Sequence, residues 1–376
     1  MKALFIHFYD FAPQSGISKK IIYQIDALKA CGMDVELCYM DIDEHGNQRR
    51  LCGETIIEDF GNGFSAKFLK WFKFSKLADY ILSKKIEFVY IRSFYNINPP
   101  LLKMLGRLRK AGIKVVMELP TYPYDTEVKN TALKYRFIFI LNRIYRNRLR
   151  NYIDRIVTFT DYPVIHGVKT ICISNGIDFN NIKLKSTIND THDKLNLIGV
   201  AEIHFWHGFD RIIRGMAEYY KQNPKVEVHF NIVGDGVPKD VKMLMELSKE
   251  NGLDKYVHFL GSSFGEELDG LFEKSDFGIA SLARHRSDIT KIKTLKNREY
   301  AARGIPFIYS EIDDDFENMP YILKAPADES AIDINGIIDF YRSLKMSPSE
   351  IRDTIAGTLS WNVQMQKVID ETFKKQ

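Results

Sequence analysis

Residues 275–310, SDFGIASLARHRSDITKIKTLKNREYAARGIPFIYS, contain in order a short apolar run, a polar basic loop, a helical segment and a second apolar run. The run SDFGIASL at 275–282 predicts a buried strand. Gly304 predicts the end of the helix, and 305–310 predicts the next strand. Together these segments form one βαβ unit, which indicates a parallel sheet whose ligands bind at the carboxyl ends of the strands.

The loop that follows the first of these strands is strongly basic. Cations beside the N-terminus of a helix favour an anion, and phosphate is the anion we expect there. Glu299 stands just inside the helix, where a carboxylate among cations suits the hydroxyl pair of a sugar while the cations bind phosphate. The basic side chains of this stretch are Arg284, His285, Arg286, Lys291, Lys293, Lys296 and Arg298.

Two short motifs resemble those of one enzyme family. Residues 299–306, EYAARGIP, are similar to the E-x-x-A-x-G-x-P stretch of retaining nucleotide-sugar glycosyltransferases of the GT-B fold, the group-1 (family 4) type. Residues 174–178, SNGID, resemble the I-x-N-G-I/V-D signature that begins the second domain in that family. The family glutamate is the second acid of an E-x7-E pair and holds the donor ribose. The first acid falls at Lys291 here, so this chain departs from the pair.

The resemblance implies an architecture that the order of segments also indicates. Two successive arrays of alternating strands and helices occupy about 1–165 and 170–345, as in doubly wound sheets. The implied fold class is α/β of the GT-B type, with two doubly wound Rossmann-like domains facing across a cleft. We expect an acceptor-binding domain at 1–168, to which a C-terminal helix near 358–376 returns, and a nucleotide-sugar-binding domain at 169–357.

The composition is that of an ordinary globular protein, with 45% hydrophobic and 27% charged residues in a chain of 376. The four cysteines form no C-x-x-C motif and have no neighbourhood typical of a metal site, which predicts reduced thiols in a cytoplasmic protein. The first residues, MKALFIHFYDFAPQ, predict a strand and not a signal peptide. No apolar run reaches the roughly eighteen residues that a membrane span requires.

Positive charge is concentrated in the front half of the chain. Residues 1–165 hold 26 Lys and Arg against 17 Asp and Glu, whereas the remainder is net acidic. Residues 131–150 predict a long basic amphipathic helix around the apolar run FIFIL, and 65–85 predict a helix whose early lysines alternate with aromatic residues. Such helices favour peripheral contact with an anionic membrane, at the inner face of the cytoplasmic membrane. A core helix with a solvated outer face is the alternative, and no motif for nucleic acid binding occurs.

The resemblance assigns a donor-binding set to the second domain. In the family, the loop before Gly208 carries an arginine and a lysine for the donor diphosphate; here His207 stands at the lysine position and no arginine stands upstream. The glycines after the next strand let the backbone approach the nucleotide, and backbone groups near Leu260 edge its base. His204 and His207 have no third ligand nearby, so we expect no metal site. The implied donor-binding residues are Glu299, His207, Gly234, Gly236, Leu260, Thr294 and Leu295.

Catalysis in this interpretation depends on fixed cations. Lys296 and Arg286, with His207, neutralise the diphosphate leaving group, so that neither a metal nor another cofactor is needed. The proton of the acceptor hydroxyl passes to a phosphate oxygen of the donor, or to Asp125 or Glu127, and the sequence leaves these routes open.

The acceptor side is assigned to two loops of the first domain. Gly16 permits a sharp turn after the first strand, although most glycines in such loops simply make the turn. The proline-stiffened loop 120–127 follows another strand and carries Tyr122 and Tyr124 beside Asp125. In the family this region faces the transferred sugar; a rigid surface turn whose tyrosines cover a helix is the alternative.

The sequence thus predicts a retaining glycosyltransferase. It would move a hexose-type sugar from a UDP- or GDP-linked donor to a saccharide or polyprenyl-linked acceptor, in the assembly of a capsule, lipopolysaccharide or exopolysaccharide. Two alternatives remain open, because Lys291 and His207 depart from the family pattern. One is a GT-B module that binds nucleotide sugars without turnover, and the other is a nucleotide-sugar epimerase.

Overall fold

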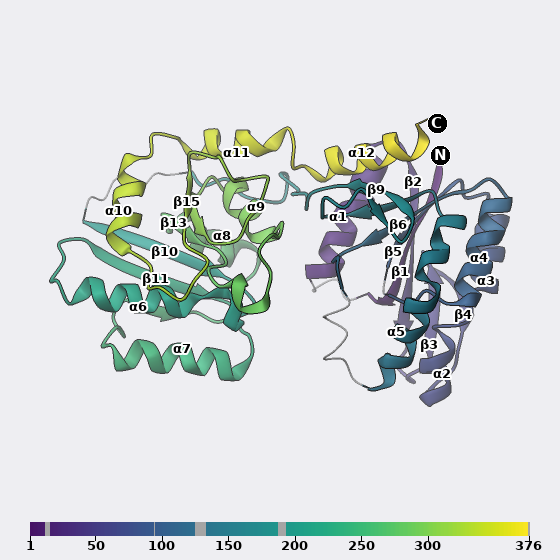
Figure 1. The fold of residues 1–376 in the computed structure, drawn as a ribbon, viewed down its shortest axis with the longest axis horizontal. Helices are drawn as coiled ribbons and strands as arrows, with labels where there is room; N and C mark the ends of the chain where they lie inside the picture. The colour runs from purple at the N-terminus through teal and green to yellow at the C-terminus, as the bar shows by residue number, and fades with distance from the viewer. Residues whose placement is uncertain (12–15, 94, 125–132, 187–192, 375–376) are drawn as a thin grey trace. The chain divides into compact units, whose positions relative to one another are not determined.

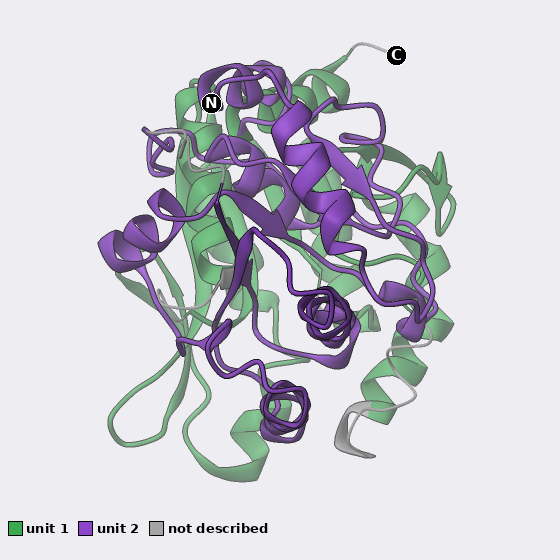
Figure 2. Cartoon of the chain, turned by 90° about the vertical axis from the view of Figure 1, so that its left-hand side faces the viewer, with its two compact units in different colours: residues 1–174, 361–376 green, residues 175–360 purple. Residues whose placement is uncertain are grey.

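The chain forms two compact units, Met1–Ser174 together with Trp361–Gln376, and Asn175–Ser360 (Figures 1 and 2). The expected boundary at 168/169 falls at the start of β9 (Val168–Cys172), which continues the first sheet. The computed structural model describes residues 1–11, 16–93, 95–124, 133–186 and 193–374.

The sheet of the first unit has the strand order β4-β3-β2-β1-β5-β6-β7-β9-β8. β1 pairs in parallel with both β2 and β5, and its residues from Ala3 to Phe8 are buried, as expected of a central strand covered on both faces. The strands are β1 (Lys2–Asp10), β2 (Asp34–Ile42), β3 (Gln48–Cys52), β4 (Thr55–Asp59), β5 (Phe88–Arg92), β6 (Lys114–Leu119), β7 (Arg155–Thr158), β8 (Val164–Ile165) and β9.

The C-terminal helix α12 (Trp361–Phe373) belongs to this first unit. Its Trp361, Met365 and Val368 are buried in the same apolar cluster as Ile21 and Leu28 of α1. The other helices of the unit are α1 (Gly16–Ala30), α2 (Gly63–Leu69), α3 (Ser75–Ser83), α4 (Pro99–Lys110), α5 (Leu133–Tyr145) and the 3₁₀ helix η2 (Arg146–Asn151).

The two predicted basic helices differ from expectation in length. The segment 65–85 is broken between α2 and α3, because Arg50 donates hydrogen bonds to the carbonyls of Lys70 and Lys73 and so holds the chain out of helical geometry. Trp71 and Phe74 are buried at this break. The segment 131–150 is an α-helix only as far as Tyr145 and continues as η2.

The sheet of the second unit is parallel throughout, with the order β12-β11-β10-β13-β14-β15. In chain order this is 3-2-1-4-5-6, the arrangement of a dinucleotide-binding Rossmann sheet. The order reverses between β10 and β13, and the loops that follow these two strands meet there. The strands are β10 (Lys194–Val200), β11 (Glu227–Val233), β12 (Val257–Phe259), β13 (Phe277–Ile279), β14 (Phe307–Tyr309) and β15 (Ile322–Lys324).

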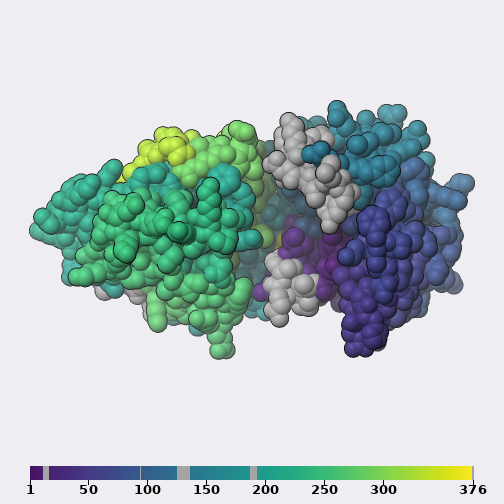
Figure 3. Space-filling view, turned by 90° about the horizontal axis from the view of Figure 1, so that it is seen from below, coloured from purple at the N-terminus to yellow at the C-terminus, as the bar shows by residue number. Residues whose placement is uncertain are grey.

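Helices cover both faces of this second sheet (Figure 1). α7 lies at the surface, where Figure 3 shows it in green, and its Met243 and Met245 are exposed. The helices are η3 (Phe205–His207), α6 (Phe209–Tyr220), α7 (Pro238–Glu250), α8 (Gly265–Glu273), η4 (Arg284–Ser287), α9 (Leu295–Ala302), α10 (Ile334–Ser343) and α11 (Pro348–Ala356).

The βαβ unit predicted at 275–310 is present as β13, α9 and β14. Gly304 ends the helical segment with φ +75°, and a Cβ atom there would lie 2.5 Å from the Pro348 carbonyl oxygen. Because of both restrictions, only glycine fits this position. Within the described residues, no helix is both long enough and apolar enough to cross a membrane.

Candidate functional site

The loops after β10 and β13 are joined at the point where the strand order reverses. The Leu282 N–H donates to the His207 carbonyl at 2.9 Å, and the Ala283 N–H donates to the Trp206 carbonyl at 3.3 Å. Gly208 has φ +68°, and a Cβ atom there would lie 2.9 Å from Cβ of Leu282. The glycine therefore permits the close contact that holds the two loops together.

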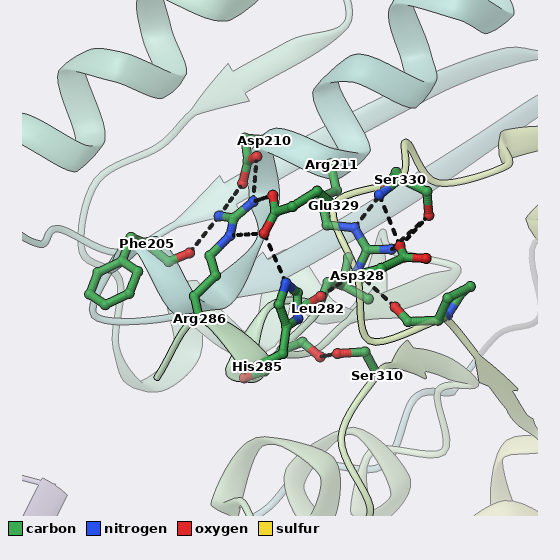
Figure 4. Close-up of polar contacts among 12 residues, drawn as sticks. Phe205, Asp210, Arg211, Leu282, His285, Arg286, Ser310, Asp328, Glu329 and Ser330 are labelled. Atoms are coloured by element: carbon green, nitrogen blue, oxygen red, sulfur yellow. Dashed lines mark hydrogen bonds and ion pairs between the residues drawn. The ribbon is translucent and has the colours of Figure 1, made fainter. Parts of the chain in front are cut away.

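Arg286, one of the predicted diphosphate cations, is bound entirely by protein groups (Figure 4). Its guanidinium donates two hydrogen bonds of 2.9 Å to the Asp210 carboxylate, two to the Glu329 carboxylate and one to the Phe205 carbonyl. A guanidinium has five N–H donors, and all five are used. These contacts give Arg286 a structural role, in place of the predicted role at a diphosphate.

Arg211 makes a second set of contacts beside the Arg286 group (Figure 4). This fully buried arginine donates to the carbonyls of Ser330, Pro326 and Leu282, and it pairs with Asp328 at 3.2 Å. The two arginines together fix the loop after β13 to α6 and to residues 326–330. The backbone of the site is therefore rigidly supported from both sides.

Three of the other six basic side chains of this loop pair with the acidic segment 313–315, which follows β14. Lys291 contacts Asp314 at 2.6 Å, and Lys293 contacts Asp315 at 3.7 Å. Arg298 is fully buried and binds both Asp313 and Asp315. This segment neutralises charges that the sequence alone presents as available for phosphate.

Lys296 and Arg284 are the lysine and the arginine of the basic loop that keep an unsatisfied nitrogen atom among the described residues; Nδ1 of His285, whose Nε2 pairs with Glu329, is unsatisfied as well. Nζ of Lys296 and Nε of Arg284 are buried, and among the described residues neither has a hydrogen-bond partner. Burial, together with the nearby charge of Arg284, lowers the pKa of Lys296 to about 7. Buried polar groups in proteins are normally hydrogen-bonded, so these two nitrogens mark a place where an anionic ligand can bind.

Glu311, which the sequence analysis missed, lies close to the same two cations. It is 2% exposed, and both carboxylate oxygens are buried without a hydrogen-bond partner among the described residues. Burial raises its pKa to about 7, against the opposing effects of its own backbone N–H, of Arg284 and of Lys296. Its position one residue after Ser310, at the carboxyl end of β14, is the signal that could have identified it.

His207 is a neutral hydrogen-bond donor and not a cation. Its Nδ1 accepts the backbone N–H of His204 at 3.1 Å, which places the proton of the neutral ring on Nε2. Burial, and then the positive charges of Lys296 and Arg284, lower its pKa far below the usual range. The imidazole can thus donate to a phosphate oxygen, but it does not supply the predicted positive charge.

The start of α9 carries three of the predicted donor-binding residues. Thr294 caps the helix by accepting the Asn297 N–H, and Leu295 at the first helical position is exposed. Glu299 accepts two hydrogen bonds from Arg303, both on Oε1, at 3.1 and 3.0 Å. Arg303 therefore fixes the orientation of the Glu299 carboxylate, which is the group predicted to bind ribose.

The predicted glycine loop packs against protein backbone. A Cβ atom on Gly234 would lie 1.9 Å from the Ala201 carbonyl oxygen, and one on Gly236 would lie 2.1 Å from the Ile203 carbonyl oxygen. The Leu260 N–H donates to the carbonyl of Ile232. These residues hold the loops after β10, β11 and β12 together, which accounts for the glycines without a nucleotide.

The predicted acceptor residues lie in the first unit. Tyr124 is buried, with its hydroxyl 2.9 Å from Nε2 of His166 and 3.1 Å from Nδ2 of Asn142. Tyr122 is half-buried and contacts Tyr162 edge to face, with ring centroids 5.0 Å apart. Gly16 begins α1. Asp125 and Glu127 lie outside the described residues.

Comparisons with known proteins show what this fold is similar to. No family model matches the chain, and no curated protein matches it. Among solved structures, a glycosyltransferase from Rickettsia africae is similar over 100% of this chain and 99% of its own, with a TM-score of 0.69 and 14% identity. HepE of Anabaena in complex with UDP gives a TM-score of 0.64 at 15% identity, over 98% and 99%.

A third similar structure is WaaG, a glycosyltransferase involved in lipopolysaccharide biosynthesis. It has a TM-score of 0.58 and 13% identity, over 99% of this chain and 100% of its own. At such identities the likeness establishes the fold. The predicted fold class is confirmed: the chain has the GT-B fold of these glycosyltransferases, with two Rossmann-like α/β units.

Proposed function

We propose that this protein is a glycosyltransferase that uses a nucleotide-sugar donor. The observation that carries the proposal is the pair of buried nitrogens, Nζ of Lys296 and Nε of Arg284, that lack partners among the described residues. They belong to the loop and helix that follow β13, at the reversal of a Rossmann sheet, where such sheets bind nucleotides. The fold shared with structures described as glycosyltransferases supports the same activity.

In this proposal the second unit binds the donor. Lys296 and Arg284 neutralise the diphosphate, and the N–H of His207 Nε2 adds a hydrogen bond to a phosphate oxygen. The carboxylate of Glu299, which Arg303 orients, accepts hydrogen bonds from the ribose hydroxyls. HepE, which has the same fold, forms a complex with UDP, and this favours a nucleoside diphosphate as the leaving group here as well.

The reaction breaks the bond between the anomeric carbon and the diphosphate oxygen and forms a bond from that carbon to the acceptor oxygen. The acceptor proton moves to the departing diphosphate. Because Lys296 and Arg284 supply fixed positive charge, the leaving group is stabilised without a metal. Attack and departure on one face of the sugar would retain the anomeric configuration, as the motif resemblance implies.

The acceptor binds the first unit in this proposal, and it is a saccharide that belongs to a lipid-linked or surface polysaccharide. The described part of α5 supports a location at an anionic membrane. Phe137, Ile140 and Ile144 are spaced along this helix and are 52%, 56% and 59% exposed, with exposed Arg136 and Arg143 beside them. An exposed apolar stripe flanked by arginines suits the headgroup region of an anionic bilayer.

The decisive experiment measures donor turnover. The purified protein is incubated with UDP-, GDP- and ADP-sugars, with and without saccharide acceptors. Released nucleoside diphosphate and new glycosides are quantified, and the anomeric configuration is read by NMR. Lys296→Met and Arg284→Met should each lose at least about tenfold in turnover, as expected when a hydrogen bond to a charged group is removed. Lys291→Met, whose cation pairs with exposed Asp314, is the matched control and should remain active.

The same assay separates the alternatives. Thermal stabilisation by a nucleotide sugar, without nucleotide release for any acceptor, indicates a binding module. A changed sugar in the absence of acceptor indicates an epimerase. If neither stabilisation nor release occurs with any donor of the three nucleotide classes, the proposed function is wrong.

A further inference from the structure

Glu311 is a buried acid whose side chain has no partner in the described part of the protein. Both of its carboxylate oxygens are buried, and neither accepts a hydrogen bond. No ion pair within 4.0 Å joins this carboxylate to Lys296 or Arg284, although the charges of all three influence one another. An unpaired carboxylate in such a place costs free energy unless a ligand supplies hydrogen-bond donors.

The chain places Glu311 beside the position where the acid pair is broken. A short parallel bridge joins Lys291 to Ile312, with hydrogen bonds from the Ile312 N–H to the Thr290 carbonyl and from the Ile292 N–H to the Ile312 carbonyl. Ile312 is exposed and Lys291 pairs with exposed Asp314, whereas Glu311 is buried. A buried acid therefore directly precedes the residue that pairs with Lys291.

The chemistry of the cluster limits what the ligand can be. Lys296 and Arg284 favour an anion, whereas the Glu311 carboxylate repels one and accepts hydrogen bonds at up to four positions. A free phosphate would satisfy the cations and leave the acid unpaired. A sugar esterified to phosphate satisfies both, because its hydroxyl groups donate to the acid while its phosphate contacts the cations.

We propose that Glu311 binds the hydroxyl groups of the donor's sugar, and so distinguishes a nucleotide sugar from the free nucleoside diphosphate. This inference rests on the proposed function and adds to it the residue that reads the transferred sugar. The inference also defines the class of donor. At the positions that contact Glu311, the donor's sugar carries free hydroxyl groups and no charged group. A carboxylate on the sugar at that point would face the Glu311 carboxylate and be rejected.

The test compares two ligands that differ only in the sugar. Dissociation constants are measured by titration calorimetry for UDP and UDP-glucose, and for GDP and GDP-mannose, with the wild-type protein and with Glu311→Gln. Glu311→Gln keeps the size of the side chain and removes the charge. The expected result is a loss of about tenfold to a hundredfold in affinity for the sugar ester, the range for hydrogen bonds to a charged group, with affinity for the free diphosphate unchanged or increased.

Asp314→Asn is the matched control. It removes a nearby acid, Asp314, that already pairs with Lys291. It should leave the ratio of the two affinities unchanged. Glu311→Ala is a second variant, and thermal unfolding of each variant shows that it is folded. Because the charge of Glu311 is buried and unpaired, its removal should not destabilise the protein.

The outcomes are separable. If the wild-type protein binds neither UDP nor GDP nor their sugar esters, the proposed function fails. If it binds them and Glu311→Gln weakens free diphosphate and sugar ester equally, Glu311 acts only through Lys296 and the inference is overturned. An unchanged ratio in both Glu311 variants overturns it as well, while the function stands.

Discussion

Arg286 and Asp210 form a bidentate ion pair, with two parallel N–H···O hydrogen bonds of 2.9 Å between residues 76 positions apart in the chain. Asp210 lies in the first turn of α6, so the pair joins that helix to the loop after β13. Asp210 is 5% exposed, and its carboxylate is therefore largely shielded from solvent. Paired arginines of this kind fix geometry more than they attract ligands. The site's shape therefore depends on this contact.

Replacing Arg286 should destabilise the protein. Arg286→Met leaves a buried carboxylate without its main partner, at a cost on the order of 3 kcal/mol in the free energy of unfolding. Urea denaturation followed by circular dichroism measures this change. Lys242→Met, on an exposed pair with Glu246, is the control and should change stability by less than about 1 kcal/mol. Unchanged stability together with lost UDP affinity would return Arg286 to the ligand-binding set.

Gly208→Ala should displace the loop that carries His207. The new Cβ atom would lie 2.9 Å from Cβ of Leu282, in a backbone conformation that costs an alanine roughly 1–2 kcal/mol. We expect a lower melting temperature and weaker UDP binding. Gly270→Ala is the control, because its added methyl group meets nothing within 4 Å and α8 should gain about 0.5–1 kcal/mol. Equal stability changes in the two variants would contradict the tight contact at Gly208.

Affinity for UDP should fall as the pH rises above about 7. Burial lowers the pKa of Lys296 to about 7, so this lysine loses its charge above that pH in the ligand-free protein. Burial also raises the pKa of Glu311 to about 7, so a negative charge develops beside the cations over the same range. Both changes weaken the binding of an anion such as UDP. Each proton lost from the site can lower the affinity up to about tenfold per pH unit.

The pH dependence can be assigned to Lys296 or Glu311 by measuring the UDP affinity of variants from about pH 7 to pH 9. Lys296→Met should bind UDP more weakly at pH 7 and show a shallower decline, because only Glu311 still titrates. Glu311→Gln should also be shallower, yet bind UDP at least as well as the wild type. A wild-type affinity that is constant across this range is the result that would count against both assignments.

The stripe on α5 should bind anionic vesicles. Ile140→Asp with Ile144→Asp replaces apolar surface by charge that such a membrane repels, and co-sedimentation with vesicles of phosphatidylcholine and phosphatidylglycerol should drop severalfold. Met245→Asp is the matched control. Met245 lies on α7 and is exposed to a similar extent, so this change should leave vesicle binding unchanged. Wild-type protein that stays in the supernatant at low salt would exclude this membrane contact.

The fold was predictable because its signals are local. A single stretch, 275–310, contains the apolar runs of β13 and β14 and the glycine that ends α9. Such local patterns of apolar residues indicate strands and helices without reference to distant parts of the chain. Helix length was less predictable. Nothing near 65–85 reveals that Arg50 takes the carbonyls of Lys70 and Lys73.

The sequence predicts a phosphate site in this loop, but it does not show which of the loop's cations already have protein partners. Whether an arginine binds phosphate or protein depends on acids far along the chain, and Arg286 finds Asp210 and Glu329, which lie 76 and 43 residues away. Lys296 remained a candidate because its nitrogen meets no such acid among the described residues. Glu311 was missed because in sequence it is one of several acids in EIDDDFEN. Asp313 of the same stretch is also buried but is bound by Arg298, so Glu311 differs by being buried without a partner among the described residues.

The pairing of segment 313–315 with Lys291, Lys293 and Arg298 has a consequence for long-range electrostatics. These three cations are compensated by acids, so the basic loop does not extend a broad positive potential into solvent. A polyanion that requires a continuous track of exposed charge would find none along this loop. The charges that remain are buried, and buried charges are screened little by dissolved ions. Binding of a small diphosphate should therefore persist at high ionic strength, where loosely held polyanions are released.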